Sequence, residues 1–269
     1  MNELQNRLYK MLCWFHKYCV DNDIAYYAVG GTMLGAARHH GFIPWDDDID
    51  VGIPRKDYNR LINTFNKPID GYYLESPYAG KEDFLYTFSK LYDINSTLVE
   101  HTRNDCKRGI YIDVFPLDGI GNSKEEAFSK LKKFDRKNMF LMMRTCAIKS
   151  EREWYKNLSI IAARAIPSFL VKEKELSISL DKLANSMNDD SAIYWANLNG
   201  TYRYKEIVEK NIFGHPTLYE FEGEKIYGPQ FFDEYLTAIY GDWRKLPPEN
   251  KRKSAHDYIT LDYNKSYFE

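Results

Sequence analysis

Residues 27–54 read YAVGGTMLGAARHHGFIPWDDDIDVGIP, in which a glycine pair precedes four aspartates packed into five positions. The mutual repulsion of these carboxylates is costly unless water, basic side chains or a divalent cation offsets it. Apolar residues alternate with Asp48 and Asp50, which indicates a half-buried β-strand with both carboxylates on one face. Two carboxylates on a rigid face are ligands that Mg²⁺ uses when it also holds phosphates.

The glycine pair lies between a β-prone run, residues 24–29, and a helix-like segment, residues 33–38. Glycines allow a close approach to the backbone, and a helix N-terminus carries a favourable partial charge, so Gly30, Gly31 and Thr32 are predicted to bind an anion. A plain turn beside an exposed acidic loop is the alternative. The acidic strand downstream favours a site for phosphates and metal.

A third carboxylate stands inside another β-prone run, residues 110–115, IYIDVF. Asp113 is the only charge in this run, and burying an unpaired acid costs about 2 kcal/mol or more, so a partner is expected. One alternative is a buried structural salt bridge, and the other is coordination of the metal held by Asp48 and Asp50. By contrast, Asp118 in PLDGI is predicted to be a solvated cap in a turn.

These segments resemble known proteins. Gly30-Gly31, DIDV at residues 48–51 and IDV at residues 112–114 are similar to the three-part signature of the polymerase-β-type nucleotidyltransferase fold. The seventeen-residue step from Gly31 to Asp48 is longer than that fold's usual spacing, and it favours the LicD family of phosphocholine transferases, to which fukutin-type phosphotransferases are related. The segments that resemble LicD are GTMLGAARHHGFIPWDDDIDVGIPRKDY, KLYDINSTLVE, GIYIDVFPLDGI and YGDWRKLPPENKRKSAH.

The resemblance implies an α/β (α+β) fold, a nucleotidyltransferase-type mixed sheet flanked by helices. We expect one domain, residues 1–269, with a helical insertion at about 123–188, where no motif matches. The implied activity is Mg²⁺-dependent, or Mn²⁺-dependent, transfer of phosphocholine from CDP-choline to a sugar hydroxyl, releasing CMP. The implied acceptor is a lipid-linked sugar or oligosaccharide precursor of teichoic acid, surface polysaccharide or glycolipid. Asp48, Asp50 and Asp113 would be the catalytic residues and the metal ligands.

Several other residues are predicted to contact substrate. Arg38 is expected either to clamp a phosphate or to pair with Asp46 or Asp47. Lys90, in an apolar and aromatic context, is expected either to bind phosphate or to extend to solvent. The predicted substrate-binding set is Gly30, Gly31, Thr32, Arg38, Trp45, Lys90, Arg252 and His256.

Three members of that set, Trp45, Arg252 and His256, are predicted from choline recognition and from the C-terminal motif. A quaternary ammonium is held over aromatic faces by cation–π attraction, for which Trp45 is the first candidate and Tyr111 the second, with plain core packing as the alternative. Arg252 and His256 have the spacing of one helical face, and the resemblance places them near the active site.

Amino-acid composition limits the class of protein and its expected location in the cell. The net charge is −2 and the pI about 6.3, so no global field favours nucleic acid. The four cysteines form no CxxC pair, and no signal-peptide core is evident, which favours reduced thiols in a cytoplasmic protein. Residues 151–172 mix basic, aromatic and aliphatic side chains, so peripheral contact with the inner face of the cell membrane is an alternative to ordinary packing.

Hydrophobic periodicity and turn residues predict the remaining elements. Helices are expected at 2–22, 54–65, 123–147, 151–165, 174–187 and 231–240, strands at 71–75, 85–92 and 97–101, and a hairpin at 217–227. Two rival functions remain: nucleotidyl transfer from a nucleoside triphosphate, and a non-catalytic module that binds a nucleotide sugar.

Overall fold

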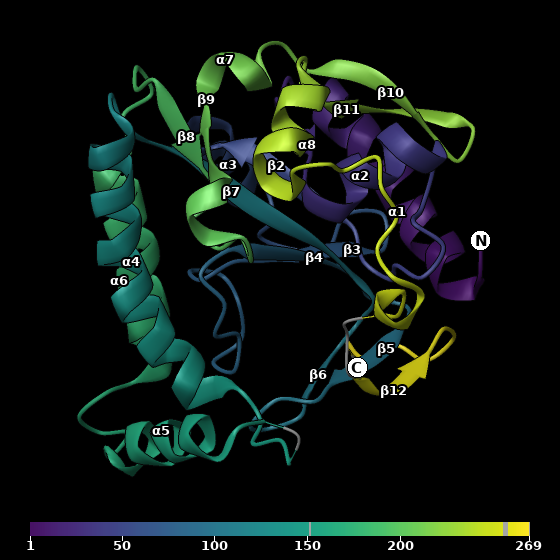
Figure 1. Ribbon diagram of the computed structural model, residues 1–269. Coiled ribbons are helices and arrows are strands. Elements are labelled where there is room, and N and C mark those ends of the chain that lie inside the picture. Colours follow the sequence, from purple (N-terminus) through teal and green to yellow (C-terminus); the bar gives the residue numbers. More distant parts are fainter. Residues whose placement is uncertain (151, 255–257, 269) are drawn as a thin grey trace.

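A curled mixed β-sheet flanked by helices forms the body of the protein (Figure 1). The computed structural model describes residues 1–150, 152–254 and 258–268. The helices in these ranges are α1 (Glu3–Asp21), α2 (Gly30–His39), α3 (Arg55–Ile62), α4 (Lys124–Thr145), α5 (Trp154–Ala165), α6 (Glu173–Met187), α7 (Lys210–Phe213) and α8 (Phe232–Tyr240), with 3₁₀ turns η1 (Arg203–Glu206) and η2 (Glu249–Lys251).

The strands of these same ranges fall into three sheets. They are β1 (Tyr27–Ala28), β2 (Asp50–Pro54), β3 (Tyr72–Glu75), β4 (Ser89–Asp93), β5 (Thr97–Glu100), β6 (Cys106–Arg108), β7 (Tyr111–Gly121), β8 (Tyr194–Ala196), β9 (Ile207–Glu209), β10 (Thr217–Phe221), β11 (Glu224–Gly228) and β12 (Tyr258–Asp262). The main sheet has the order β1-β2-β7-β4-β3, in which β2 and β7 are parallel. β8 continues it by pairing with the last part of β7, and β9 pairs with β8.

The fold is therefore of the expected mixed class, and most of the predicted elements are confirmed. The N-terminal helix starts with a capping box in which the Gln5 N–H donates to Asn2 Oδ1 at 2.8 Å and the Asn2 N–H donates to Gln5 Oε1 at 3.0 Å. Likewise α4 begins after Ser123, whose hydroxyl accepts from the Glu126 N–H. The β10–β11 hairpin turns at Gly223, whose φ of +87° suits glycine.

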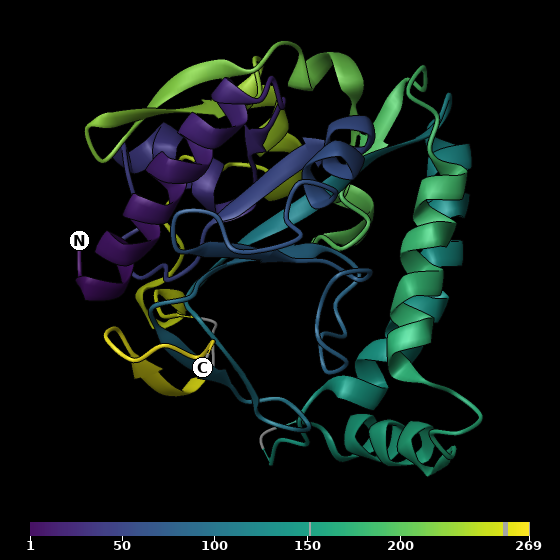
Figure 2. The same ribbon diagram turned by 180° about the vertical axis from the view of Figure 1, so that it is seen from behind.

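Helices cover the sheet in layers. Figure 2 shows α1 and α3 over one face, while α8 lies in front of the opposite face in Figure 1 and contacts α2. α4 and α6 pack against each other and against β7, where they enclose a second apolar cluster that includes Leu131, Phe134 and Leu180. In the described ranges, no helix combines the length and the apolar character needed to cross a bilayer.

A buried ion-pair network joins these layers and overturns the expectation for Asp118. That residue lies within β7 and is fully buried. Its charge is compensated by Arg55 at the start of α3, which donates to both of its oxygens at 2.7 and 2.9 Å. The same guanidinium donates to Asp181 of α6 at 2.7 Å. The turn prediction was wrong because the balancing cation lies 63 positions earlier in the sequence.

We predict that Arg55→Met destabilises the protein by about 3–5 kcal/mol, because it leaves two buried carboxylates without their cation. Lys56→Met is the control on the same helix: Lys56 is exposed, so the loss of its charge should cost less than about 1 kcal/mol. Urea denaturation of both variants measures the difference. Equal losses would contradict a special role for the buried network.

Candidate active site

The parallel register of β2 against β7 places two of the predicted carboxylates side by side. Asp50 is the Cα partner of Asp113, and the Asp113 N–H donates to the Ile49 carbonyl at 2.9 Å. β2 begins at Asp50, so Asp48 lies in the loop before the strand and not on a shared strand face as expected. Asp48 still acts electrostatically on both carboxyl groups. The structure therefore gathers all three acids, although not through a period-two strand.

The glycine turn lies directly against this acidic group. A Cβ at Gly30 would meet Asp50 Oδ2 at 3.1 Å, and one at Gly31 would meet Asp46 Oδ2 at 2.8 Å. Gly30 also has a φ of +54°, which side-chain-bearing residues rarely adopt. Glycine is thus needed here for both conformation and space.

Two hydrogen bonds tie the first turn of α2 to its neighbours. α2 begins at Gly30, three residues earlier than the predicted helical segment, and the side chain of its N-cap residue Val29 makes no capping hydrogen bond. The Gly30 N–H donates to the Tyr235 hydroxyl at 3.1 Å, and the Thr32 hydroxyl accepts from the Asp50 N–H at 2.8 Å. Thr32 therefore ties the helix start to the acidic strand.

Lys90 forms a buried ion pair with Asp113. It lies opposite Asp113 in the β4–β7 register, and its Nζ is 2.9 Å from Asp113 Oδ1 and 3.7 Å from Glu100 Oε1. The ammonium also lies 3.4 Å from the ring centroid of Tyr111 and 4.5 Å from that of Tyr86. Lys90 is buried, so the expectation that it extends to solvent is wrong, and the salt bridge foreseen for Asp113 is present.

Burial and neighbouring charges set the acidities of this group. Burial, together with the charges of Asp48 and Asp113, raises the pKa of Asp50 well above its ordinary value. Burial raises the pKa of Asp113 to about 6, an effect that Lys90 opposes and Glu100 reinforces. Burial alone would lower the pKa of Lys90, but Asp113 and Glu100 raise it overall. Lys90 is therefore the buried ammonium that opposes the charge of Asp113 and Glu100 within the described residues.

The donor set suits a hard divalent cation. In the described part of the chain, no three His, Cys, Asp or Glu side chains are already arranged to hold a metal ion. The carboxylate oxygens of Asp46 and Asp50 nevertheless face the glycine turn, and Asp113 stands beside Asp50. Carboxylates next to a phosphate-binding turn are the oxygen donors that Mg²⁺ prefers, so the residues fit such an ion. A bound cation would also lower the raised carboxyl pKa values.

The C-terminal segment folds back onto the acidic loop. The Ser254 hydroxyl donates to Asp47, and the Arg252 guanidinium lies 5.8 Å from the ring centroid of Trp45. Arg252 directly follows η2 and has a non-helical conformation, so it does not lie on the helix that was predicted to carry both Arg252 and His256. His256 lies outside the described residues. Arg38 donates to the carbonyls of Trp243 and Lys245, which holds this segment in place.

Sequence reasoning did not identify three residues near the glycine turn. Tyr235 receives the Gly30 hydrogen bond, and the pKa values of Tyr235 and Tyr240 are both raised, by burial first and by charges that include Asp50. Glu206 is buried, and its Oε1 accepts from the Tyr202 N–H at 3.3 Å. Burial raises the pKa of Glu206 to about 7. No sequence motif marks these residues, because long-range packing brings them to the site.

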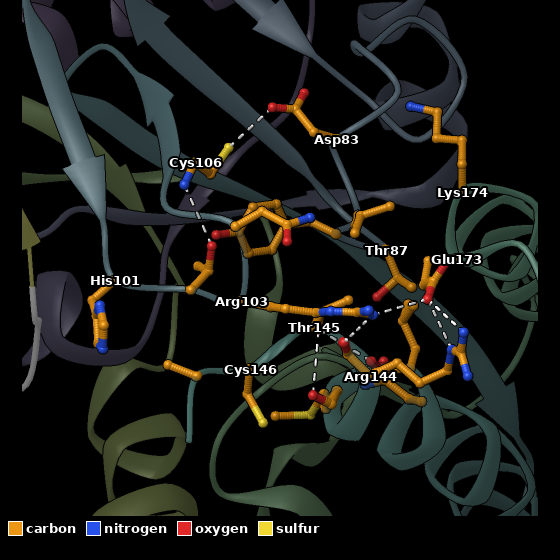
Figure 3. A pocket seen from close by; sticks show the side chains of 18 of the residues that line it. Asp83, Thr87, His101, Arg103, Cys106, Arg144, Thr145, Cys146, Glu173 and Lys174 are labelled. Carbon is orange, nitrogen blue, oxygen red and sulfur yellow. Dashed lines mark hydrogen bonds and ion pairs between the residues drawn. The ribbon is translucent and has the colours of Figure 1, made fainter. Parts of the chain in front are cut away.

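A cavity of about 760 Å³ opens next to the site, between the loop before β4, the β5–β6 connection and the helices α4 and α6 (Figure 3). Tyr86 and Phe88 line it, and the Tyr86 ring also contacts the Lys90 ammonium, so the cavity and the acidic site share a wall. Figure 3 shows Arg103 and Arg144 converging on Glu173, with Nη1–Oε1 and Nε–Oε1 distances of 3.4 and 2.9 Å.

Comparison with known proteins supports the sequence resemblance. Residues 23–157 match the family model described as LicD/FKTN/FKRP, nucleotidyltransferase domain. The chain is 28% identical over 268 residues to the lipopolysaccharide cholinephosphotransferase LicD of Haemophilus influenzae, covering 95% of this chain and 97% of that protein.

Two more distant relatives match over shorter stretches. The human ribitol 5-phosphate transferase FKRP is 53% identical over 34 residues, which cover 13% of this chain and 7% of that protein. The mannosyltransferase regulator 4 of Saccharomyces cerevisiae is 28% identical over 120 residues, which cover 43% of this chain and 10% of that protein.

We predict that Glu206→Gln stabilises the protein increasingly as the pH rises from 5 to 8. With a folded-state pKa of about 7 against an ordinary value of 4.5, the folded state holds more protons than the unfolded state between these values, so stability falls as the pH rises through that window. The variant removes this penalty, on the order of 2 kcal/mol. Melting temperatures across the pH range measure it, with exposed Glu220→Gln as the control. Parallel pH curves for Glu206→Gln and the wild type would contradict the assignment.

Proposed function

Because the chain belongs to the LicD/FKTN/FKRP nucleotidyltransferase-domain family, we propose that this transferase moves phosphocholine from CDP-choline to a sugar hydroxyl, releasing CMP. The observation that carries the proposal is the glycine turn packed against paired carboxylates in a chain that matches a cholinephosphotransferase over nearly its whole length. The acceptor class proposed is a lipopolysaccharide, teichoic acid or related lipid-linked sugar precursor.

Asp48, Asp50 and Asp113 would hold Mg²⁺, or Mn²⁺ in its place. When bound, the cation would neutralise charge on the donor's diphosphate and on the CMP leaving group. The chain's own residues would position the diphosphate. Gly30 and Gly31 allow the diphosphate to approach the start of α2, whose N-terminal partial charge favours an anion.

The reaction needs an acceptor for the hydroxyl proton and the cleavage of one phosphorus–oxygen bond. The acceptor hydroxyl oxygen attacks the phosphorus that carries choline, the bond from that phosphorus to the bridging oxygen breaks, and its electron pair leaves with CMP. We assign the hydroxyl proton to Asp113, because burial in β7 makes this carboxylate more basic than an ordinary aspartate, although a bound cation would reduce that added basicity. Lys90, 2.9 Å away, supports the ionised form and adds positive charge beside the transferred group.

The remaining substrate contacts follow from placement. Thr32 holds the glycine turn against β2 through the Asp50 N–H. Burial lowers the pKa of Arg38, and the nearby charge of Arg252 lowers it further. The two arginines therefore form a basic group beside the acidic loop. We propose that this group meets the donor's phosphates and that Trp45, already in contact with a cation, faces the choline.

Nucleotidyl transfer remains the rival that the same geometry permits. It would use the same phosphate turn and carboxylates, but attack would occur at the α-phosphorus of a nucleoside triphosphate and would release pyrophosphate. A non-catalytic binding module is disfavoured, because the three carboxylates are all present and gathered at the turn.

We predict that the purified protein with Mg²⁺ and a lipopolysaccharide acceptor releases CMP from CDP-choline and no pyrophosphate from nucleoside triphosphates. Asp50→Asn should lower the rate at least about a hundredfold, equivalent to about 3 kcal/mol of transition-state stabilisation. Asp21→Asn is the control, since Asp21 is exposed on α1 and pairs with Lys17. Chromatography of the products reads out both. Pyrophosphate as the product, or an Asp50→Asn variant with near-full turnover, would overturn the proposal.

We predict that Trp45→Leu weakens CDP-choline binding by about 1–2 kcal/mol, because leucine removes the electron-rich face that attracts a fixed cation. CMP and CDP-glycerol, which lack the ammonium, should bind almost equally to variant and wild type. Calorimetric titration of the three ligands makes the comparison. Equal losses for CMP and CDP-choline would show that Trp45 only supports the acidic loop.

A further inference from the structure

α5 and the segment after it carry the most exposed large apolar side chains of the described residues. Phe169, Trp154 and Leu170 are 79%, 75% and 66% exposed, the three highest values among the large apolar side chains. Leu158 and Ile161 are also more than half exposed. Isolated exposed apolar residues need no explanation, but such a concentration within seventeen positions marks an interaction surface.

The exposed residues share one side of the helix. Trp154, Leu158 and Ile161 are spaced by four and three positions, so they form a single stripe. The buried residues of α5, Ile160 and Ala163, point elsewhere, and α5 contacts α4. The stripe is therefore additional to the face that packs against the protein. Figures 1 and 2 both show α5 at the end of the α4 and α6 helices, away from the main sheet.

The segment is held in a fixed orientation. The buried Arg144 donates through Nη1 to the carbonyls of Ala163 and Ile166 at 2.7 and 2.8 Å. Arg164 donates to the carbonyl of Cys146. These bonds fix both ends of the turn after α5 to the end of α4, so the apolar stripe is presented by a rigid support.

The charge around the stripe is positive. Residues 149–172 contain five basic and two acidic residues, whereas the whole chain has a net charge of −2. The side chains of Lys156 and Lys172 are 54% and 63% exposed and pair with the exposed Glu153 and Glu175, so the net positive charge of the segment rests on Lys149, Arg152 and Arg164 as well. Lysine stems lie along apolar surface while the ammonium stays in water, and tryptophan favours the boundary between water and an apolar phase. This combination is typical of a helix that lies in the headgroup region of a bilayer.

We propose that the face formed by Trp154, Leu158, Ile161, Phe169 and Leu170 docks on the surface of a bilayer that contains anionic lipids. A second copy of the chain is the competing occupant. A two-fold contact through this face would bring the same positive segment of each copy together, which opposes association. An anionic lipid surface complements that charge instead.

Docking would also orient the neighbouring cavity. Ser168 and Lys172, in the exposed segment, line its wall, as do Lys149 and Arg152 before α5. Tyr86 and Phe88 line the same cavity, and their ring centroids lie 4.5 and 5.8 Å from the Lys90 ammonium. A bilayer against α5 would therefore lie beside a cavity whose wall also contacts Lys90. The proposal stands on exposure and charge and does not depend on the identity of the transferred group.

Vesicle sedimentation tests the docking without donor or acceptor. The full chain should sediment with vesicles of phosphatidylcholine and phosphatidylglycerol and much less with phosphatidylcholine alone, because the attraction includes the positive charge. The double variant Trp154→Ser with Phe169→Ser should weaken binding at least about tenfold, since it removes the two most exposed aromatic anchors. Leu218→Ser, a similar change at an exposed position on β10, should leave binding unchanged.

A charge variant and a mass measurement complete the test. Lys156→Glu with Lys172→Glu should weaken binding to the phosphatidylglycerol vesicles and leave the weak binding to phosphatidylcholine unaltered. Absence of vesicle binding, or equal binding by the Trp154→Ser, Phe169→Ser double variant, would overturn the proposal. Light scattering that shows a dimer abolished by the double variant, without vesicle binding, would assign the face to self-association instead. CMP release by the double variant in detergent separates this outcome from failure of the transferase assignment.

Discussion

The parallel register of β2 against β7 is the constraint on which the rest of the site depends. It sets Asp50 beside Asp113 within a sheet, where water cannot screen the two carboxylates well. The buried ammonium of Lys90 opposes part of that charge. Burial first, and then the neighbouring carboxylates, raise the pKa values of Asp50 and Asp113. A site built in this way favours ligands that bring positive charge with them, and a divalent cation bound together with a diphosphate meets that demand.

Lys90 shows how the surrounding structure limits the cost of a buried charge. Its ammonium contacts Asp113, Glu100 and the rings of Tyr86 and Tyr111, so carboxylates and aromatic faces replace the water it has lost. These partners come from three separate strands or loops. Tyr86 contacts the ammonium and also lines the large cavity, so the position of the Lys90 side chain and the shape of the cavity wall are linked through this ring.

The sequence predicted features that depend on local pattern and missed those that depend on distant partners. The α1 helix, the start of α4 after Ser123 and the hairpin at Gly223 were predictable because capping, periodicity and turn chemistry lie within a few residues. Asp118 was misassigned because its turn-like context conceals a partner at the start of α3. Asp48 was placed on a strand because its pattern alternates, but β2 begins only at Asp50. Tyr235 carries no local signal, since it reaches Gly30 from 205 positions away.

The buried guanidinium of Arg55 has a consequence for how this architecture can vary. It neutralises one carboxylate of the catalytic sheet's β7 and one of α6, so the helical segment between β7 and β8 is electrostatically part of the sheet. A shorter version of the protein without that segment would leave the Arg55 guanidinium with one carboxylate instead of two. Loss of the helices would therefore require compensating changes at Arg55 and Asp118. Such a joint requirement makes the segment difficult to remove by single mutational steps.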